Sequence, residues 1–144
     1  MAEFDALKLE NQLCFPLYAC SREIIKKYKP HLDRLDLTYT QYITMMVVWE
    51  HKSITVKALG DILYLDSGTL TPLLKKLEAK GLVRRTRSTE DERNLIISMT
   101  PKGEELRVEA LSIPGEMAKE MKLEPSEVDV LYKLLYKMLQ TSEA

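Results

Sequence analysis

One run of leucines constrains the fold of this chain more than any other feature. Between residues 66 and 81, four leucines recur at i, i+3, i+4 and i+7, the spacing of one buried helical face: Leu70, Leu73, Leu74 and Leu77. Asp66 precedes the run as a residue that caps helices well, and Gly81 follows it as a residue that favours leaving a helix. The pattern predicts a helix with a buried face and a polar face.

Pro72 leaves a second interpretation open, because a proline inside a helix lacks the N–H that would bond the carbonyl four residues earlier. In a shorter helix, Thr71 would be the N-cap and Pro72 would take the favoured first position. We prefer the longer helix, since Leu70 keeps phase with the later leucines and Pro72 falls on the outward face.

The segments on both sides of this helix predict a winged helix-turn-helix. Residues 55–63 form a helical pattern capped by Thr55, and a turn of about three or four residues separates it from the leucine helix. Residues 82–87 and 94–99 have strand-like compositions and are joined by a polar run, as in a β-hairpin.

Further helical patterns precede this motif. Residues 7–29 form a long helical candidate that we expect Pro30 to end, and Pro16 predicts either a kink or a true start near Leu13. The helix at 38–51 is expected to begin with a capping box, in which a threonine caps the helix and a glutamine reaches back to the backbone: Thr38 and Gln41. Its almost wholly apolar sequence predicts a place in the core.

The C-terminal part also reads as helical. Thr100 caps a helix that we expect to run to about Ile113, where Pro114 and Gly115 break or bend it. Residues 125–140 carry apolar side chains in helical phase. A helical dimer interface would bury these apolar rows. We therefore expect a mostly α protein with a small β-hairpin, a single domain over 1–144, with a winged helix-turn-helix at 37–100 and helical dimerisation regions at 1–36 and 101–144.

Charge is unevenly placed along the 144 residues. The whole chain has a net charge of −1, but residues 75–93 hold seven basic and four acidic side chains, a net charge of +3 that leaves −4 elsewhere. Such a cluster suits contact with a polyanion, because neutralising phosphates supplies most of the non-specific affinity for DNA. The alternative is an ordinary solvated surface.

Composition also excludes several classes of protein. No apolar run approaches the ~20 residues that a bilayer requires, so we expect no signal peptide or membrane span and a cytoplasmic protein. The sequence has no nucleotide loop, no paired metal ligands and no Cys-X-X-Cys, and we expect neither cofactor nor metal. Cys14 and Cys20 are separated by about 9 Å of helical rise, beyond the ~7 Å limit for a disulfide.

A cysteine among tyrosines is the remaining chemical feature. Cys14 shares a helical stripe with Tyr18 and Tyr28, although a buried cysteine is most often simply a small apolar residue. Tyr28 lies about 21 Å along the helix from Cys14, so it would reach a thiol only in a partner subunit, across an antiparallel twofold crossing. Phenolic hydroxyls would there stabilise a thiolate or a sulfenate.

Four segments carry a resemblance to a known family: LENQLCF at 9–15, LTYTQY at 37–42, LDSGTLTPLL at 65–74 and DER at 91–93. Together they resemble the organic-hydroperoxide-sensing repressors of the MarR family, the OhrR type, over roughly residues 7–140. The third segment is fairly specific to that branch, whereas Asp-X-Arg is shared by the wider MarR family.

The resemblance implies a homodimeric repressor, not an enzyme, that binds a pseudo-palindromic operator in double-stranded DNA. Its redox-sensing residue would be Cys14, hydrogen-bonded by Tyr18, Tyr28 and Tyr39, the last two across the dimer. An organic hydroperoxide and a low-molecular-weight thiol would be its reactants. In the wing, Asp91 would hold Arg93 as it enters the minor groove. The candidate DNA-binding residues are Ser67, Thr69, Thr71, Lys75, Lys76, Arg85, Asp91 and Arg93.

The chain departs from the family pattern in three places. It has no cysteine in the C-terminal region to resolve an oxidised Cys14, so it resembles the one-cysteine type that couples to a small thiol. Cys20 is additional, and Pro16 lies close to the reactive position.

Two other hypotheses stay open at this point. One is a MarR-type regulator that responds to a small aromatic ligand or to a different oxidant. The other is a thiol peroxidase with Cys14 as nucleophile, which we disfavour because no basic or hydroxyl residue flanks that cysteine.

Overall fold

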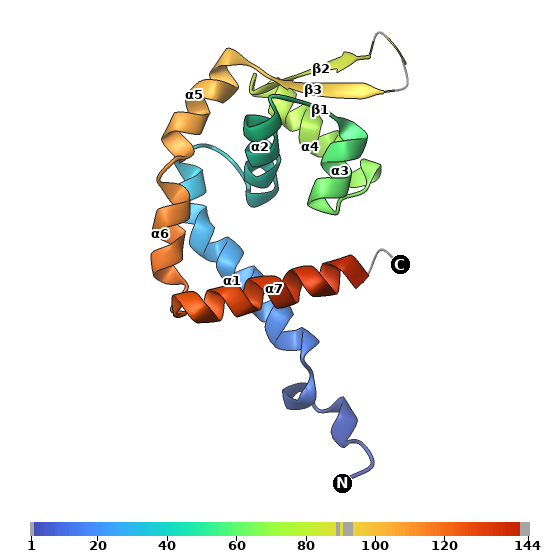
Figure 1. The fold of residues 1–144 in the computed structure, drawn as a ribbon, viewed down its shortest axis with the longest axis vertical. Coiled ribbons are helices and arrows are strands. Elements are labelled where there is room, and N and C mark those ends of the chain that lie inside the picture. The colour runs from blue at the N-terminus through green and yellow to red at the C-terminus, as the bar shows by residue number, and fades with distance from the viewer. Residues whose placement is uncertain (1, 89, 91–93, 142–144) are drawn as a thin grey trace. The chain divides into compact units, whose positions relative to one another are not determined.

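The computed structural model describes residues 2–88, 90 and 94–141 (Figure 1). The chain separates into two compact units, one up to Ile113 and the other from Pro114 onward, and each is described by itself. Asp91 and Arg93 lie outside the described residues. Among the helices of the described ranges, none combines the length and the apolar character needed to cross a bilayer.

As the sequence predicts, the structure is mostly helical and contains few strands. Two short 3-10 turns, Asp5–Leu7 and Leu9–Asn11, come first. The first unit continues with α1 (Cys14–Asp33), α2 (Tyr39–His51), β1 (Ser53–Thr55), α3 (Val56–Leu63), α4 (Ser67–Ala79), β2 (Val83–Arg87), β3 (Leu95–Met99) and α5 (Pro101–Ala110). The boundary between the units falls at the start of α6 (Ile113–Glu120), and α7 (Pro125–Thr141) follows.

The predicted helix caps are confirmed. The Thr38 Oγ1 accepts from the Gln41 N–H at 3.3 Å, while the Gln41 Oε1 accepts from the Thr38 N–H at 3.0 Å, which completes the capping box of α2. Thr55 caps α3 by accepting from the N–H of Ala58 at 3.1 Å. These bonds satisfy N–H groups that the first turn of a helix leaves without intrahelical partners.

The longer of the two interpretations of the leucine helix is confirmed. Helix α4 begins directly after Asp66, and Pro72 lies inside it with an exposed ring. The turn from α3 is tight: Tyr64 adopts a φ of 57°, and the Leu65 N–H bonds the Gly60 carbonyl at 3.0 Å. A Cβ on Gly60 would lie 2.7 Å from the Leu65 carbonyl oxygen, so this turn requires a glycine there.

The sheet has one strand more than the predicted hairpin. Its order is β1-β3-β2, with β3 antiparallel to both neighbours and Ile97 paired with Ile54 on one side and Arg85 on the other. The three-residue β1 is too short to show a period-2 pattern, which is why sequence analysis missed it. Helices α2, α3 and α4 lie on one side of these strands (Figure 1).

The core of the winged motif is built from the predicted apolar faces. The four leucines of the α4 row are buried, with exposed fractions between 0% and 8%, and they join side chains from α2, α3 and the central strand: Met45, Val48, Leu59 and Ile97. Burying each such side chain contributes on the order of 1.5–3 kcal/mol. The predicted core position of the 38–51 helix is confirmed.

The structure corrects both predicted boundaries of helix α1. It starts at Cys14, which confirms a start near Leu13 and shows that the start at Leu7 was wrong. Pro16 is the third residue of α1, where its missing N–H would have had no intrahelical partner. The expected end at Pro30 was also wrong, because α1 runs to Asp33. Its last turn carries Leu32, which is 2% exposed, and burial of this side chain offsets the hydrogen bond that Pro30 cannot donate.

The C-terminal helices also depart from the expected boundary. Helix α5 ends at Ala110 rather than near Ile113, and Pro114 and Gly115 lie in the first turn of α6, which the sequence pattern did not predict. A proline near the start of a helix costs no intrahelical hydrogen bond, so Pro114 begins a helix here instead of breaking one. Helix α7 matches the predicted segment 125–140 to within one residue.

Candidate DNA interface and thiol site

The outward face of α4 presents the polar residues predicted to contact DNA. Ser67, Thr69, Thr71, Lys75 and Lys76 are all exposed, and they alternate with the buried leucines because the helical period puts the two sets on opposite faces. A helix with this face free can enter a major groove, whose width admits one α-helix.

The N-terminal end of α4 is fixed by its own first turn. The Asp66 Oδ1 accepts from the N–H of Thr69 at 2.8 Å, and this hydrogen bond holds the pKa of the Asp66 carboxyl below its usual value. The Thr71 Oγ1 donates to the carbonyl of Ser67 at 2.8 Å. These contacts are local, so this end of the helix is left open to the solvent.

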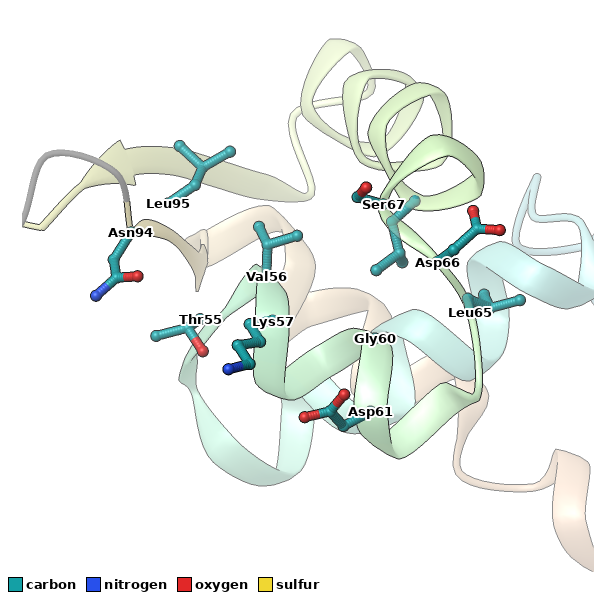
Figure 2. A pocket seen from close by; sticks show the side chains of 11 residues that line it. Thr55, Val56, Lys57, Gly60, Asp61, Leu65, Asp66, Ser67, Asn94 and Leu95 are labelled. Atoms are coloured by element: carbon teal, nitrogen blue, oxygen red, sulfur yellow. The ribbon is translucent and has the colours of Figure 1, made fainter. Parts of the chain in front are cut away.

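A cavity of about 410 Å³ lies beside this end of α4, against the start of α3 and the base of β3 (Figure 2). Leu65, Leu70 and Val56 contribute its apolar part. Charged and polar side chains of α3, of the start of α4 and of the residue before β3 also line it: Lys57, Asp61, Asp66, Ser67 and Asn94. The cavity therefore joins both helices of the helix-turn-helix to the first residues of β3.

Arg85 is held by α4 rather than pointing freely outward. Its Nε donates to the Glu78 Oε1 at 3.1 Å and its Nη2 lies 3.0 Å from the same oxygen. The Arg85 hydrogen bond lowers the pKa of the Glu78 carboxyl. Glu78 lies on α4 and Arg85 on β2, so the pair ties the wing to the helix. The assignment of Arg85 to DNA contact stays a prediction.

The Cys14 thiol lies in the N-terminal part of the first unit. Cys14 is the first residue of α1 and is exposed, as is Cys20, and both are free thiols. One turn after Cys14, Tyr18 is 57% exposed; its hydroxyl accepts from the Arg22 Nη1 at 3.3 Å, and the guanidinium lies 5.7 Å from the ring centroid. Cys14 and Tyr18 thus share an exposed stretch of helix.

The other two predicted tyrosines meet each other instead of the thiol. The ring centroids of Tyr28 on α1 and Tyr39 on α2 are 5.0 Å apart, and Tyr42 lies 5.7 Å from Tyr28 and 6.4 Å from Tyr39. Burial, followed by the neighbouring phenols, raises the pKa of Tyr42 to about 12, and burial also raises that of Tyr28. Tyr28 and Tyr42 therefore stay protonated at neutral pH and can donate hydrogen bonds.

Sequence analysis missed Tyr42 and Glu78 as members of these sites. Tyr42 follows Tyr39 by three residues on α2, the helical spacing of side-by-side residues, and this spacing was the available signal. Glu78 carried no comparable signal, because its partner Arg85 lies on a different element. Within the described residues, no group of three or more His, Cys, Asp or Glu side chains is placed to hold a metal ion.

A capped helix-turn-helix followed by an antiparallel hairpin defines the class of winged-helix DNA-binding proteins. Residues 26–110 match the family model described as transcriptional regulator SarA/Rot. The chain belongs to this SarA/Rot and MarR-type family of winged-helix transcriptional regulators, and within it to the OhrR type. The resemblance found in the sequence is confirmed, and the family consists of regulators rather than enzymes.

Individual relatives match over most of their length. The organic hydroperoxide resistance transcriptional regulator of Bacillus subtilis is 51% identical over 139 residues, which cover 96% of this chain and 95% of that protein. The HTH-type transcriptional regulator SarZ of Staphylococcus saprophyticus is 49% identical over 119 residues, covering 83% and 82%. The solved structure of reduced AbfR bound to DNA has a TM-score of 0.81 and 31% identity, with 99% of this chain and 100% of that chain covered.

Proposed function

We propose that two copies of this chain form a repressor that binds a pseudo-palindromic operator and leaves it when Cys14 is oxidised by an organic hydroperoxide. The observation that carries the proposal is the separation, within one protomer, of the exposed Cys14 thiol from the paired phenols of Tyr28 and Tyr39. The hydroperoxide resistance regulator of B. subtilis, at 51% identity, supports the same reading.

Exposed apolar side chains support a dimer. In the N-terminal segment, Leu7, Leu9 and Leu13 are 59–78% exposed, and α7 presents a row of apolar side chains that are 37–53% exposed: Val128, Leu131, Leu134, Leu135 and Met138. Large apolar surfaces of this kind mark interaction sites in proteins. A second copy related by a twofold axis would cover them with the same surfaces of its own.

An antiparallel crossing of two α1 helices would complete the thiol site. Cys14 and Tyr28 are about 21 Å apart along α1, so a phenol from this position reaches a thiol only across the dimer. Tyr39 would accompany it, because the rings of Tyr28 and Tyr39 are already in contact. Tyr18 would approach Cys14 from the same helix. The proposed site therefore takes the thiol from one protomer and two of its three phenols from the other.

The chemistry balances with two reactants. The Cys14 thiolate attacks the terminal peroxide oxygen; an S–O bond forms, the O–O bond breaks, and the leaving alkoxide takes a proton to become an alcohol. Sulfur is oxidised by two electrons to the sulfenic acid. A low-molecular-weight thiol then displaces water from the sulfenic acid to give a mixed disulfide. Each product is larger and more polar than the thiol and would displace the phenols packed on it.

Displacing the phenols would alter the spacing of the two α4 helices, which are the recognition helices of the proposed dimer. Those helices must match half-sites about one DNA turn, roughly 34–36 Å, apart, so a rigid-body change at the dimer weakens both contacts together. A shift of only a few kcal/mol suffices, because about 1.4 kcal/mol changes affinity tenfold. We place this activity in the cytoplasm, where the DNA lies.

The test compares Cys14→Ser with the matched control Cys20→Ser. A DNA fragment selected from a random pool by the reduced wild-type protein serves as probe, and cumene hydroperoxide followed by free cysteine serves as oxidant and thiol. We expect Cys14→Ser to bind the probe with unchanged affinity and to keep it after oxidation, whereas Cys20→Ser is released like the wild type. Mass spectrometry of the same samples locates the adduct.

Release of Cys14→Ser by the hydroperoxide would place the sensor elsewhere and overturn the proposal. Release of the unoxidised wild-type protein by phenolic compounds alone would favour regulation by a small aromatic ligand instead.

A further inference from the structure

The C-terminal end of the recognition helix α4 is held by hydrogen bonds from the start of α5. The carbonyl oxygens of three consecutive residues after α4, Lys80, Gly81 and Leu82, each accept a hydrogen bond. Their donors are the Lys102 Nζ at 2.8 Å, the Thr100 Oγ1 at 2.6 Å and the Thr100 N–H at 3.3 Å. This end of α4 therefore cannot move without disturbing the first turn of α5.

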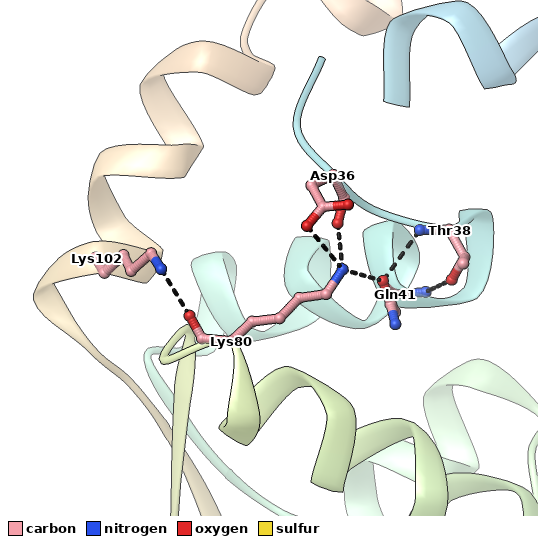
Figure 3. Close-up of polar contacts among 5 residues, drawn as sticks. All are labelled: Asp36, Thr38, Gln41, Lys80 and Lys102. Carbon is pink, nitrogen blue, oxygen red and sulfur yellow. Dashed lines mark hydrogen bonds and ion pairs between the residues drawn. The ribbon is translucent and has the colours of Figure 1, made fainter. Parts of the chain in front are cut away.

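The side chain of Lys80 binds a second segment, the loop between α1 and α2 (Figure 3). Its ammonium donates to the carbonyl of Asp36 and, at 3.2 Å, to the Oε1 of Gln41, and it lies 3.6 Å from the Asp36 carboxylate. The ammonium thus has two hydrogen-bond acceptors and one ion-pair partner, and an ammonium can donate three hydrogen bonds. Gln41 is only 4% exposed, so this contact is sheltered from water at one end.

One oxygen, the Oε1 of Gln41, connects Lys80 to the helix turn that carries Tyr39 of the Tyr28–Tyr39 pair. The Gln41 Oε1 that accepts from Lys80 also accepts from the Thr38 N–H at 3.0 Å, within the capping box of α2. Tyr39 is the first residue of that helix and contacts Tyr28. A displacement of Tyr39 thus acts on the same first turn that holds the Lys80 ammonium.

We propose that Lys80 is the positioning residue that couples the Tyr28–Tyr39 pair to the recognition helix. This inference rests on the proposed function. The side chain of Lys80 joins the α1–α2 loop and the start of α2, and its backbone carbonyl joins α5. Lys80 thus links the end of α4 to two segments, the α1–α2 loop and α5. Both of these segments lead toward the predicted dimerisation regions. Movement of either segment changes the tilt of the helix that reads the operator.

A positioning role differs measurably from a phosphate contact. The ammonium of Lys80 already has protein acceptors, and the Lys80 side chain is 31% exposed. Removing a lysine that neutralises a phosphate lowers the slope of log affinity against log salt by about 0.9. Removing Lys80 leaves that slope unchanged, because no released counterion depends on it.

The experiment uses Lys80→Met in the full chain, with Lys29→Met as matched control. Methionine keeps an unbranched apolar stem, and Lys29 is an exposed lysine whose ammonium pairs with Asp33 on its own helix. The affinity for the selected DNA fragment is measured before and after oxidation, at several salt concentrations. Mass spectrometry confirms equal oxidation of Cys14.

We expect Lys80→Met to reduce the ratio of oxidised to reduced Kd by at least fivefold, the lower end of about 5–150-fold typical of coupled sites. The salt slope stays that of the wild type, Lys29→Met keeps the full ratio, and Lys80→Arg restores most of it because a guanidinium also donates to these oxygens.

Gln41→Glu provides a second variant in case Lys80→Met fails to fold. A glutamate keeps the acceptor of the capping box and makes the contact with Lys80 charge-assisted and stronger. We expect it to raise the ratio of oxidised to reduced Kd by at least twofold. An unchanged ratio in this variant contradicts the inference.

The outcomes separate this inference from the function on which it rests. A hydroperoxide response that survives in Cys14→Ser removes the proposed function. A normal Cys14→Ser result, combined with a wild-type ratio in Lys80→Met, removes only the coupling by Lys80. A loss of about 0.9 from the salt slope would instead make Lys80 a phosphate contact.

Discussion

The two ends of the recognition helix are held in opposite ways. At the N-terminal end, the side chains of Asp66 and Thr71 bond to groups three and four residues away in the sequence, and the side chains around them are exposed. At the C-terminal end, Lys80 and the two residues after it bond to segments that lie between 18 and 44 residues away in the sequence. One end of α4 is thus fixed locally and the other by tertiary contacts.

This difference assigns the two ends different tasks. An end with local bonds and exposed polar side chains can exchange water for DNA without disturbing the rest of the fold. An end that shares hydrogen bonds with α2 and α5 sets the direction in which the helix points. Substitutions at the C-terminal end should therefore change stability, whereas those at the N-terminal end should change mainly operator affinity.

Gly103→Ala tests the tertiary end most severely. A Cβ on Gly103 would collide with the carbonyl oxygen of Leu82, a backbone atom, and the Gly103 carbonyl also accepts from the buried Trp49 indole at 2.9 Å. We expect a loss of about 3 kcal/mol in the free energy of unfolding, the upper end of the range for overpacking, measured by urea denaturation.

Gly68→Ala is the matched control at the other end of α4. Its Cβ would meet only the Asp66 carboxylate, at an ordinary 3.4 Å, so the free energy of unfolding should change by less than about 1 kcal/mol. Equal losses in the two alanine variants would remove the distinction between the ends.

Thr100→Ala should have a smaller effect than Gly103→Ala. The Thr100 hydroxyl donates to the Gly81 carbonyl and accepts from the Gly103 N–H at 3.1 Å. Alanine therefore removes the N-cap of α5 and one hydrogen bond that holds the end of α4. We expect a loss of about 1–2 kcal/mol in thermal or chemical unfolding.

Thr71→Ala removes a comparable hydroxyl bond at the exposed end. Its effect on unfolding should stay within about 0.5 kcal/mol, as for most surface substitutions, while affinity for the selected DNA falls. A Thr71→Ala protein that loses as much stability as Thr100→Ala would contradict the comparison.

Asp66→Asn should have the smallest effect, and one that depends on pH. The Asp66 pKa lies below its ordinary value of 3.8 in the folded chain, so the charged carboxylate stabilises the fold above the unfolded pKa, and this contribution is lost as the pH falls through the folded pKa. Asparagine caps helices equally well but does not titrate in this range.

The measurement is the melting temperature of both proteins from neutral pH to acid. The wild type should be slightly more stable at neutral pH, and the difference should shrink as the pH falls below about 4. A difference that is constant over this range would show that the Asp66 charge plays no part in holding α4.

Most of the winged motif could be predicted because its signals are local. The caps at Thr38, Thr55 and Asp66 and the leucine row of α4 act over three to seven residues, within reach of periodicity. The failures occurred where distant residues decided the outcome. Burial of Leu32 carried α1 past Pro30, and β1 exists only because β3 pairs with it.

The candidate site divides along the same line. The outward face of α4 follows from helical phase, and the sequence alone singled out Cys14 among its tyrosines. The pairing of Tyr28 with Tyr39 within one chain, the tie between Glu78 and Arg85 and the contacts of Lys80 were not predicted.

The sequence by itself determined the two helices, the turn and the hairpin of the winged motif, and the polar face that the second of these helices offers. Only the tertiary structure decided what holds the far end of that helix. The physical reason is range: a cap or an apolar row is satisfied by neighbours a few residues away, whereas an ammonium finds its oxygens only after the chain has folded back on itself.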